Sequence, residues 1–263
     1  MSIQGKIAVV MGASAPGGTG WAIAEALAAA GAKVVVAARN LVSLETLAAK
    51  IGGHAIACDI GNRLQVEALA KEVESRFGTI DIAVNSAGLP MIGMIADATP
   101  DALQQALDVN YLGAVHFVRT MAAIMNDGGS IVMITSYSAA QPIEPHFAYA
   151  CAKAATDCFV KYAAIEYGRR GIRVNSIQPG PIKTDLAAHL FAIPGVEDIF
   201  AREIPLGRVG NPQDYADAVL WLSGPCFVTG LNLPVNGGNQ LTRMPRTDEL
   251  SMGFDSYDAN RAA

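Results

Sequence analysis

Short apolar runs alternate with longer helical patterns along almost the whole chain. The first two runs, "IAVVM" and "KVVVAA", are rich in Val and lack polar alternation, which indicates strands covered on both faces. Strands that alternate with helices predict βαβ units, and therefore an α/β fold with a doubly wound sheet of about seven parallel strands and helices on both faces. The expected strands are Ile7–Met11, Lys33–Ala38, Ala55–Cys58, Ile80–Asn85, Ser130–Thr135, Arg173–Gln178 and Leu231–Val235, and the expected helices cover about residues 20–30, 41–51, 63–77, 100–125, 149–169 and 212–222.

Composition and charge exclude several classes of protein. The 263 residues carry a net charge of −5, so the basic footprint of a nucleic-acid-binding protein is missing. Apolar runs stay far below the roughly 18 residues of a membrane span, and the N-terminus lacks a signal pattern. We therefore expect a soluble cytoplasmic protein of one domain, residues 1–263, that binds neither nucleic acid nor a membrane. Its four cysteines form no C-x-x-C pair, and no cluster has metal-ligand spacing, so we predict small buried thiols and no metal site.

Two segments interrupt the alternation of strands and helices. Residues 181–210 contain short helical pieces and three prolines, and such a long structured connection beside a ligand crevice is typical of a lid. The tail, residues 239–263, is polar and poorly periodic. The sequence leaves open whether this tail frays, docks onto a neighbouring subunit or closes a pocket.

Four glycines lie in the nine residues "GASAPGGTG" between the first expected strand and the following helix. Glycines let the chain turn tightly and let backbone N–H groups approach a pyrophosphate, while the helix N-terminus adds favourable charge. This position in a Rossmann-type fold predicts a dinucleotide site, and we interpret Ala15 and Pro16 as extra residues that stiffen the rim. The residues predicted to bind the phosphates are Gly12, Ser14, Gly18 and Gly20.

The second expected strand ends at Ala38 and Arg39, where dinucleotide folds commonly place an acid that binds the ribose diol. Alanine cannot accept those hydrogen bonds, whereas arginine can pair with a 2′-phosphate. The sequence therefore favours NADP(H) over NAD(H). The alternative is that Arg39 is a solvated surface residue and that both cofactors bind.

The second half of the chain combines a phenol, an ammonium and a hydroxyl. Tyr149 and Lys153 are four residues apart in an expected helix, so both project from one face. A free tyrosine has a pKa near 10 and is a poor base, and a nearby ammonium is expected to lower that pKa. Ser136 follows the fifth expected strand and would reach the same crevice, since ligands bind at the carboxyl ends of parallel strands.

This arrangement resembles the short-chain dehydrogenase/reductase family in its compact single-domain branch. Ser136 precedes Tyr149 by thirteen residues, the spacing that the family uses. The resemblance extends over about residues 5–238 and includes "VNSAG", "DVNYLG", "YACAK", "NSIQPGPIKT", "RVGNPQDYADAVLWL" and "VNGG". Departures from the family pattern are Met11 for threonine, Ser86 for asparagine and Asn236 for aspartate, and none falls on the residues matched to hydride transfer.

The resemblance implies roles for individual residues. Tyr149 would be the acid/base, Ser136 would bind the carbonyl or hydroxyl oxygen, Lys153 would hold the ribose and lower the tyrosine pKa, and Asn110 would support a proton-relay water. The cofactor would also contact Asp59 with its adenine and Thr184 with its carboxamide. The remaining residues that would line the cofactor are Asn85, Ala87, Gly88, Pro179 and Gly180.

These roles predict an oxidoreductase that interconverts a ketone and a secondary alcohol, on a hydrophobic substrate of the steroid, terpenoid, aryl ketone or 3-oxoacyl type. Enoyl-thioester reductases have a similarly extended glycine turn, but they place the tyrosine seven positions before the lysine, where this chain has His146. Enoyl reduction and a non-catalytic NADP-binding regulator are the alternatives. The apolar stripes of residues 100–125 and 149–169 predict a homotetramer or homodimer. The candidate substrate-pocket residues are Gln141, Ile143, His146, Phe147, Leu186 and Leu190.

Overall fold

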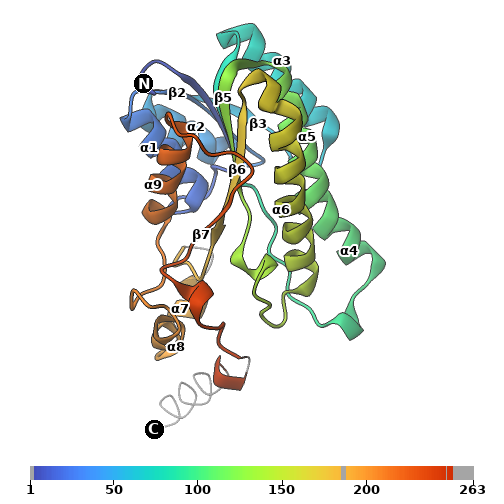
Figure 1. Cartoon of the computed structure of the whole chain (residues 1–263), viewed down its shortest axis with the longest axis vertical. Helices are drawn as coiled ribbons and strands as arrows, with labels where there is room; N and C mark the ends of the chain where they lie inside the picture. The colour runs from blue at the N-terminus through green and yellow to red at the C-terminus, as the bar shows by residue number, and fades with distance from the viewer. Residues whose placement is uncertain (1–2, 185–187, 247, 251–263) are drawn as a thin grey trace.

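The computed structural model describes residues 3–184, 188–246 and 248–250. Within them the chain forms one seven-stranded sheet in the order β3-β2-β1-β4-β5-β6-β7, and every pair of neighbouring strands is parallel (Figure 1). The strands are β1 (Ile7–Met11), β2 (Lys33–Ala38), β3 (His54–Ala57), β4 (Ile80–Asn85), β5 (Met125–Ile134), β6 (Arg173–Pro179) and β7 (Asn232–Val235). The predicted doubly wound sheet is confirmed.

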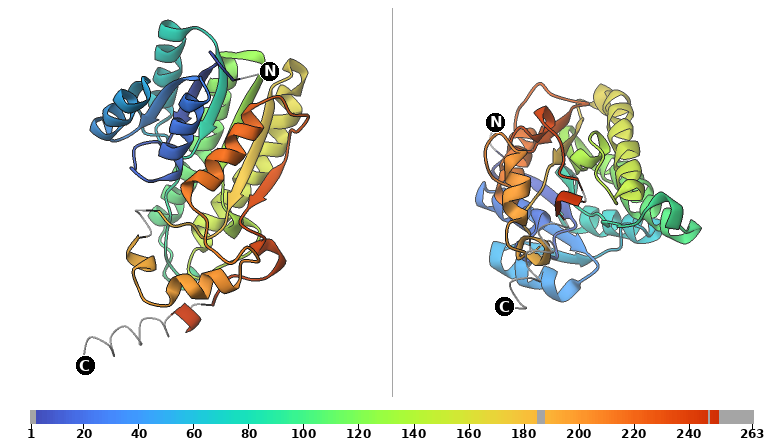
Figure 2. Two further views of the ribbon diagram at one scale, coloured as in Figure 1. Left: turned by 90° about the vertical axis from the view of Figure 1, so that its left-hand side faces the viewer. Right: turned by 90° about the horizontal axis from the view of Figure 1, so that it is seen from below.

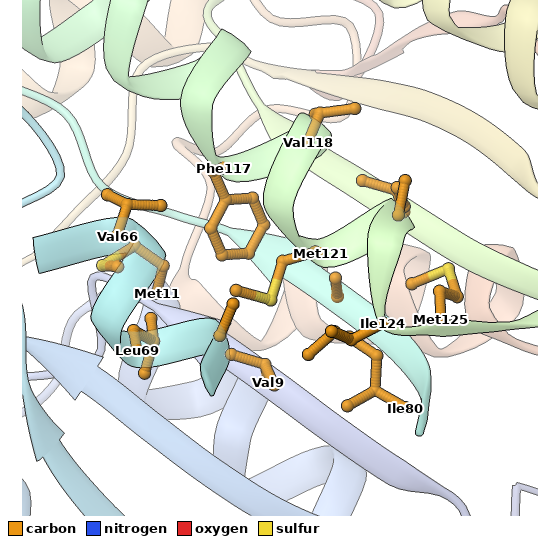
Figure 3. Close-up of a cluster of buried hydrophobic side chains, with 14 of the residues drawn as sticks. Val9, Met11, Val66, Leu69, Ile80, Phe117, Val118, Met121, Ile124 and Met125 are labelled. Atoms are coloured by element: carbon orange, nitrogen blue, oxygen red, sulfur yellow. The ribbon is translucent and has the colours of Figure 1, made fainter. Parts of the chain in front are cut away.

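Helices cover both faces of the sheet (Figure 1). The helices α1 (Thr19–Ala29), α2 (Leu41–Ile51) and α9 (Pro212–Ser223) pack on one face, and α3 (Arg63–Phe77), α5 (Gly113–Ala123) and α6 (Phe147–Tyr167) pack on the other. Figure 3 shows the second layer, in which Phe117 and Met121 of α5 meet Leu69 of α3 above Val9 and Met11 of β1. Both faces of β1 are thus buried, which explains the absence of polar alternation in its sequence.

Local side chains set the boundaries of several helices. Asn40 precedes α2, and its side chain accepts a hydrogen bond from the backbone N–H of Ser43. Helix α9 begins with a capping box in which Asn211 and Asp214 satisfy each other's backbone N–H groups. Caps of this kind stabilise a helix by about 1 kcal/mol each. They place the first residues of these helices close to the positions expected from the sequence.

The expected helix over residues 100–125 is interrupted and ends earlier. It is divided into α4 (Pro100–Leu107), a π-helical turn (Asp108–Leu112, η2) and α5, which ends at Ala123. Strand β5 begins at Met125, but its register shifts between its pairing with Ile80 and its pairing with Ile82. Residues 126–129 therefore lie outside the regular ladder, and the regular part starts at Ser130, as predicted. The sequence analysis treated residues 100–125 as one helix and did not predict the π-helical turn.

The cysteines differ in part from the prediction of buried thiols. Cys58 is buried and Cys226 is partly buried, but Cys151 and Cys158 are exposed on α6. These two residues lie on the side of α6 away from the sheet, so their burial would require a surface outside this chain. No described helix is long and apolar enough to cross a membrane.

The order of the strands places a crevice at one edge of the sheet. Successive connections turn away in opposite directions at β1 and β4, and in such sheets the ligand crevice lies at the carboxyl ends of these strands. The short helices α7 (Ala188–Phe191) and α8 (Val196–Arg202) lie beyond this edge, as Figures 1 and 2 show from two sides. The predicted lid segment is therefore positioned next to the crevice.

Candidate active site

A cavity of about 730 Å³ runs along the carboxyl ends of the strands. One end lies at Arg39 and Asp59, after β2 and β3, and the other lies at Ser136, Tyr149 and Thr184. Most of the residues predicted to contact a cofactor line this cavity: Gly12, Ser14, Gly18, Gly20, Arg39, Asp59, Ala87, Gly88, Tyr149, Lys153, Pro179, Gly180 and Thr184. The predicted phosphate site and the predicted catalytic residues therefore line the same cavity.

The glycine turn is shaped by close contact between backbones. Gly12 has a φ of +85°, and a Cβ at this position would overlap the backbone nitrogen of Ala87 and lie 2.6 Å from the carbonyl carbon of Ser86. A Cβ on Gly20 would overlap the carbonyl oxygen of Gly12. The start of α1 is therefore pressed against the ends of β1 and β4. No side chain caps the N-terminus of α1, so this cradle fits a pyrophosphate.

The extra residues of the glycine turn form a tight turn of their own. The N–H of Gly18 donates to the carbonyl of Ala15 at 2.9 Å, with Pro16 second and Gly17 third in the turn. Gly17 has a φ of +64°, and a turn with proline second and a positive φ third is typical of type II. Ala15 and Pro16 both line the cavity, in agreement with their predicted place at its rim. The sequence analysis had not singled out Gly17, although proline followed by glycine is a recognised turn signal.

Arg39 lies at the far end of the cavity with its side chain exposed. It forms no ion pair with any described residue. By contrast Asp59, also on the wall, accepts a hydrogen bond from the N–H of Gly61 at 2.9 Å. The guanidinium of Arg39 is therefore available to an anionic group of a ligand.

Asn85 differs from the other residues predicted to line the cofactor. It is buried and is absent from the cavity wall; its Oδ1 accepts a hydrogen bond from the N–H of Ala87 at 3.0 Å. The side chain thus shapes the loop after β4. In that loop Gly88 approaches the catalytic residues so closely that a Cβ would lie 3.3 Å from Lys153 Nζ.

Ser136, Tyr149 and Lys153 meet at the inner end of the cavity. Ser136 follows β5 and comes within hydrogen-bonding reach of the Tyr149 phenol, and its Oγ also lies 2.9 Å from Ser138 Oγ. Lys153 Nζ lies 5.6 Å from the centre of the Tyr149 ring and donates to the carbonyl of Ile134 at 3.0 Å. The helix α6 supplies the phenol and the ammonium from one face, as their spacing predicts.

Burial is the main influence on the pKa values of Tyr149 and Lys153 when no ligand is bound. Loss of solvent raises the pKa of Tyr149 to about 12, although the hydrogen bond from Ser136 favours the phenolate. Burial also lowers the pKa of Lys153 to about 8. The expected lowering of the tyrosine pKa is therefore not found, because desolvation of the phenolate outweighs the groups that stabilise it. At neutral pH the phenol is protonated.

Asn110 is buried in the π-helical turn η2, behind the cavity wall. Its Oδ1 accepts from the N–H of Leu89 at 3.0 Å, and its Nδ2 donates to the carbonyls of Leu89 and Ala106, each at 3.1 Å. The carbonyl of Asn110 accepts a hydrogen bond from Thr156 Oγ1 at 2.7 Å. The side chain thus fixes the loop after Gly88, and the carbonyl faces α6.

The candidate substrate-pocket residues that the structure describes are not on the cavity wall. Ile143 and Leu190 pack instead against a small apolar cluster of Val196, Phe200, Ile204 and Val209. His146 Nδ1 lies 3.3 Å from the carbonyl of Met91, Gln141 Nε2 donates to the carbonyl of Thr242 at 3.0 Å, and Phe147 begins α6. Leu186 lies outside the described residues. Ile143 and Leu190 are therefore partly buried by this cluster and do not face the cavity. Their positions along the chain did not predict this packing.

Several residues of the cavity wall were missed by the sequence analysis. They are Met11, Thr19, Ala38, Cys58, Ile60, Gly61, Asn62, Leu89, Pro90, Gln105, Asp108, Val109, Ile134, Thr135 and Ile182. Those from Cys58 to Asn62 follow β3, so the rule that ligands bind beyond the carboxyl ends of strands could have found them. Gln105 comes from α4, and no sequence signal pointed to it. Asp108 and Val109 come from the π-helical turn and belong to the motif "DVNYLG", from which only Asn110 had been selected.

The lid segment and the described part of the tail are tied to the rest of the chain. The two ends of the lid meet where Ile182 pairs with Gly210, and Lys183 forms an ion pair with Glu197 of α8 at 2.7 Å. In the tail, Arg243 forms an ion pair with Glu203 at 2.9 Å. Residues 239–246 and 248–250 thus dock beside α8 of their own chain, whereas 251–263 lie outside the described residues. Among the described residues no group of three His, Cys, Asp or Glu gathers as metal ligands do.

Comparison with known proteins gives consistent results across sequence and structure. A family model described as enoyl-(acyl carrier protein) reductase matches residues 12–240. The 7alpha-hydroxysteroid dehydrogenase of Escherichia coli strain K12 is 36% identical over 251 residues, which cover 90% of this chain and 95% of that protein. Carbonyl reductase family member 4 of Xenopus laevis is 34% identical over 239 residues, covering 90% and 98%. A short-chain type dehydrogenase/reductase structure from Mycobacterium ulcerans has a TM-score of 0.90 and 30% identity, and covers 100% of both chains.

Proposed function

Because the chain belongs to the short-chain dehydrogenase/reductase family, we propose that it is a nicotinamide-dependent oxidoreductase that interconverts a ketone and a secondary alcohol. The observation that carries this proposal is the meeting of Ser136, Tyr149 and Lys153 at the inner end of a cavity whose wall also includes the glycine cradle. The nicotinamide group supplies or accepts the hydride when it is bound.

The chain's own residues divide the remaining work. The cradle of Gly12, Gly18 and Gly20 binds the pyrophosphate, and Lys153 holds the ribose next to Gly88. Ser136 and Tyr149 hold the substrate oxygen between their hydroxyls. Because burial keeps the Tyr149 pKa at about 12, the phenol is protonated at neutral pH and donates its proton to a carbonyl oxygen that becomes an alcohol.

The names of the relatives and the position of His146 favour ketone and alcohol chemistry over alkene reduction. The relatives include a hydroxysteroid dehydrogenase and a carbonyl reductase, although the matching family model is described by an enoyl reductase. An enoyl reductase of the extended-turn type would need a tyrosine at position 146. In this chain His146 lies there and contacts the carbonyl of Met91, outside the cavity wall. We propose a hydrophobic substrate, with residues 181–210 as the lid.

We further propose that NADP(H) is preferred, with Arg39 as the residue that binds its 2′-phosphate. Arg39→Ala is expected to weaken NADP(H) binding by roughly ten- to a hundred-fold, because a charge-assisted hydrogen bond is worth about 1.5–3 kcal/mol. Binding of NAD(H) should change less than about three-fold. Titration of both cofactors by calorimetry checks this prediction. Arg169→Ala removes an exposed arginine far from the cavity as the control, and equal losses for both cofactors in Arg39→Ala would refute the assignment.

We also propose a homodimer or homotetramer in the cytoplasm. Its support is apolar surface on the predicted stripes: Leu103 and Leu107 of α4 are 38% and 40% exposed, and Tyr162 and Ile165 of α6 are 64% and 76% exposed. Light scattering after gel filtration should give about two or four times the 27.4 kDa of one chain. Ile165→Glu should reduce that mass, because a buried charge opposes association. A wild-type mass of one chain would contradict the proposal.

A further inference from the structure

A buried carboxylate lies next to the catalytic lysine on α6. Asp157 follows Lys153 by four residues, so the two side chains project from one face with their Cβ atoms about 5–6 Å apart. Both are buried, with 7% and 4% of their surfaces exposed. The roles assigned above to Ser136, Tyr149 and Lys153 make no use of Asp157.

Three neutral side chains hold the carboxylate in place. Ser176 Oγ donates to Oδ1 of Asp157 at 3.0 Å, and Gln178 Nε2 donates to Oδ2 at 2.7 Å. Thr135 adds a further hydrogen bond. Asn232 Nδ2 donates to the backbone carbonyl of Asp157 at 3.1 Å. Strands β6 and β7, and the residue that follows β5, therefore contribute donors to one residue of α6 (Figure 1).

The charges around the lysine ammonium are few. Among the described residues, Asp157 is the charged group that acts on Lys153, and the Tyr149 ring centre lies 5.6 Å from Lys153 Nζ. The groups that face this pair from β6, β7, the π-helical turn and the residue after β5 are neutral: Ser176, Gln178, Asn232, Asn110 and Thr135. A buried ammonium without a counter-charge tends to lose its proton.

We infer that Asp157 is a positioning residue whose carboxylate keeps the buried ammonium of Lys153 protonated, so that Lys153 can hold the ribose and support Tyr149. This inference rests on the proposed function for its catalytic consequence, but the charge pairing stands apart from it. Asp157 raises the pKa of Lys153 against the effect of burial. Burial raises the pKa of the Asp157 carboxyl itself, and its hydrogen bonds and the Lys153 ammonium oppose that rise. The carboxylate also raises the pKa of Tyr149, so its benefit to the phenol comes through the lysine.

The direct test is the titration of Lys153 by NMR in protein labelled with ¹³C at the lysine Cε, with the resonance assigned by Lys153→Arg. In Asp157→Asn we expect the titration midpoint of Lys153 to fall by at least about one pH unit, because the nearest counter-charge is removed. Asp157→Glu should keep the midpoint near that of the wild type. Glu166→Gln removes an exposed carboxylate from the same helix and should leave the midpoint unchanged.

The activity readout is the pH profile of kcat/KM. Its alkaline limb should move to lower pH in Asp157→Asn by the shift that the NMR titration measures, an effect that a merely structural role would not produce. If Asp157→Asn does not fold, Ser176→Ala keeps the carboxylate, removes one of its hydrogen bonds and should shift Lys153 in the same direction by less. An unchanged Lys153 midpoint in the folded variants would overturn the inference. A shifted midpoint in a protein that reduces no ketone would support the inference and contradict the proposed function instead.

Discussion

Tyr149→Phe is expected to lower kcat/KM for ketone reduction by about 10²- to 10⁴-fold, the range typical of the loss of a general acid. The variant keeps the ring, which lies 5.6 Å from Lys153 Nζ, and removes only the hydroxyl that hydrogen-bonds Ser136. The cradle of glycines elsewhere on the cavity wall is untouched. NADPH binding, measured by calorimetry, should therefore stay within about three-fold of the wild type.

The matched control for this prediction is Tyr162→Phe. Tyr162 lies on the same helix, α6, but its side chain is exposed and far from the cavity wall. The loss of its hydroxyl should leave turnover, followed by NADPH absorbance, unchanged. Wild-type turnover by Tyr149→Phe would remove Tyr149 from the role of acid/base.

Gly12→Ala is expected to abolish cofactor binding within the sensitivity of calorimetry, or to prevent folding. Two effects add at this position. Its φ of +85° strains any residue with a Cβ by roughly 1–2 kcal/mol. The new Cβ would also overlap the backbone of Ala87, which is part of β4's exit loop and cannot move like the end of a flexible side chain. The ends of β1 and β4 would have to move apart, and this movement would distort the glycine cradle.

Gly78→Ala separates these two effects. Gly78 has a similar φ of +76° at the end of α3, but no atom lies within 4 Å of a Cβ built there. This control should carry the backbone strain alone, with a modest fall in melting temperature and unchanged NADPH affinity. If Gly12→Ala bound NADPH as well as Gly78→Ala does, the glycine turn would not be the pyrophosphate site.

The sheet could be predicted from the sequence because both faces of its strands are buried. Continuous Val and Ile runs such as β1 and β2 have the bounds that the sequence predicted, Ile7–Met11 and Lys33–Ala38. The edges and connections were harder. The π-helical turn at Asp108–Leu112 and the irregular start of β5 depend on tertiary contacts, including the hydrogen bond from Thr156 to the Asn110 carbonyl.

The candidate site shows the same division. Residues that follow a strand, such as Gly12, Gly88 and Ser136, were placed correctly on the cavity wall, because the carboxyl ends of parallel strands converge. Residues chosen for the substrate pocket by their proximity to Tyr149 along the chain were not on that wall. Ile143 packs against the apolar cluster that contains Val196 and Phe200, and His146 contacts the carbonyl of Met91. Residues close to Tyr149 along the chain need not point into the same cavity, because α6 begins at Phe147 and turns successive side chains in different directions.

The protonation of the pair could not be deduced from spacing either. Four residues between Tyr149 and Lys153 predict a shared helix face, but not the depth at which that face is buried. Burial raises the pKa of Tyr149 to about 12 and lowers that of Lys153 to about 8. The sequence does contain one sign of this electrostatic environment, the acidic residue Asp157 in the mostly apolar segment after Lys153. The hydrogen-bond partners of Asp157 come from strands distant along the chain, so the sequence did not reveal them.

The most direct test is a crystal structure of the chain with NADP⁺ bound. The account predicts a pyrophosphate against Gly12, Gly18 and Gly20, a 2′-phosphate at Arg39 and a nicotinamide ring facing the space shared by Ser136 and Tyr149. A dinucleotide bound with its nicotinamide away from those two hydroxyls would contradict it.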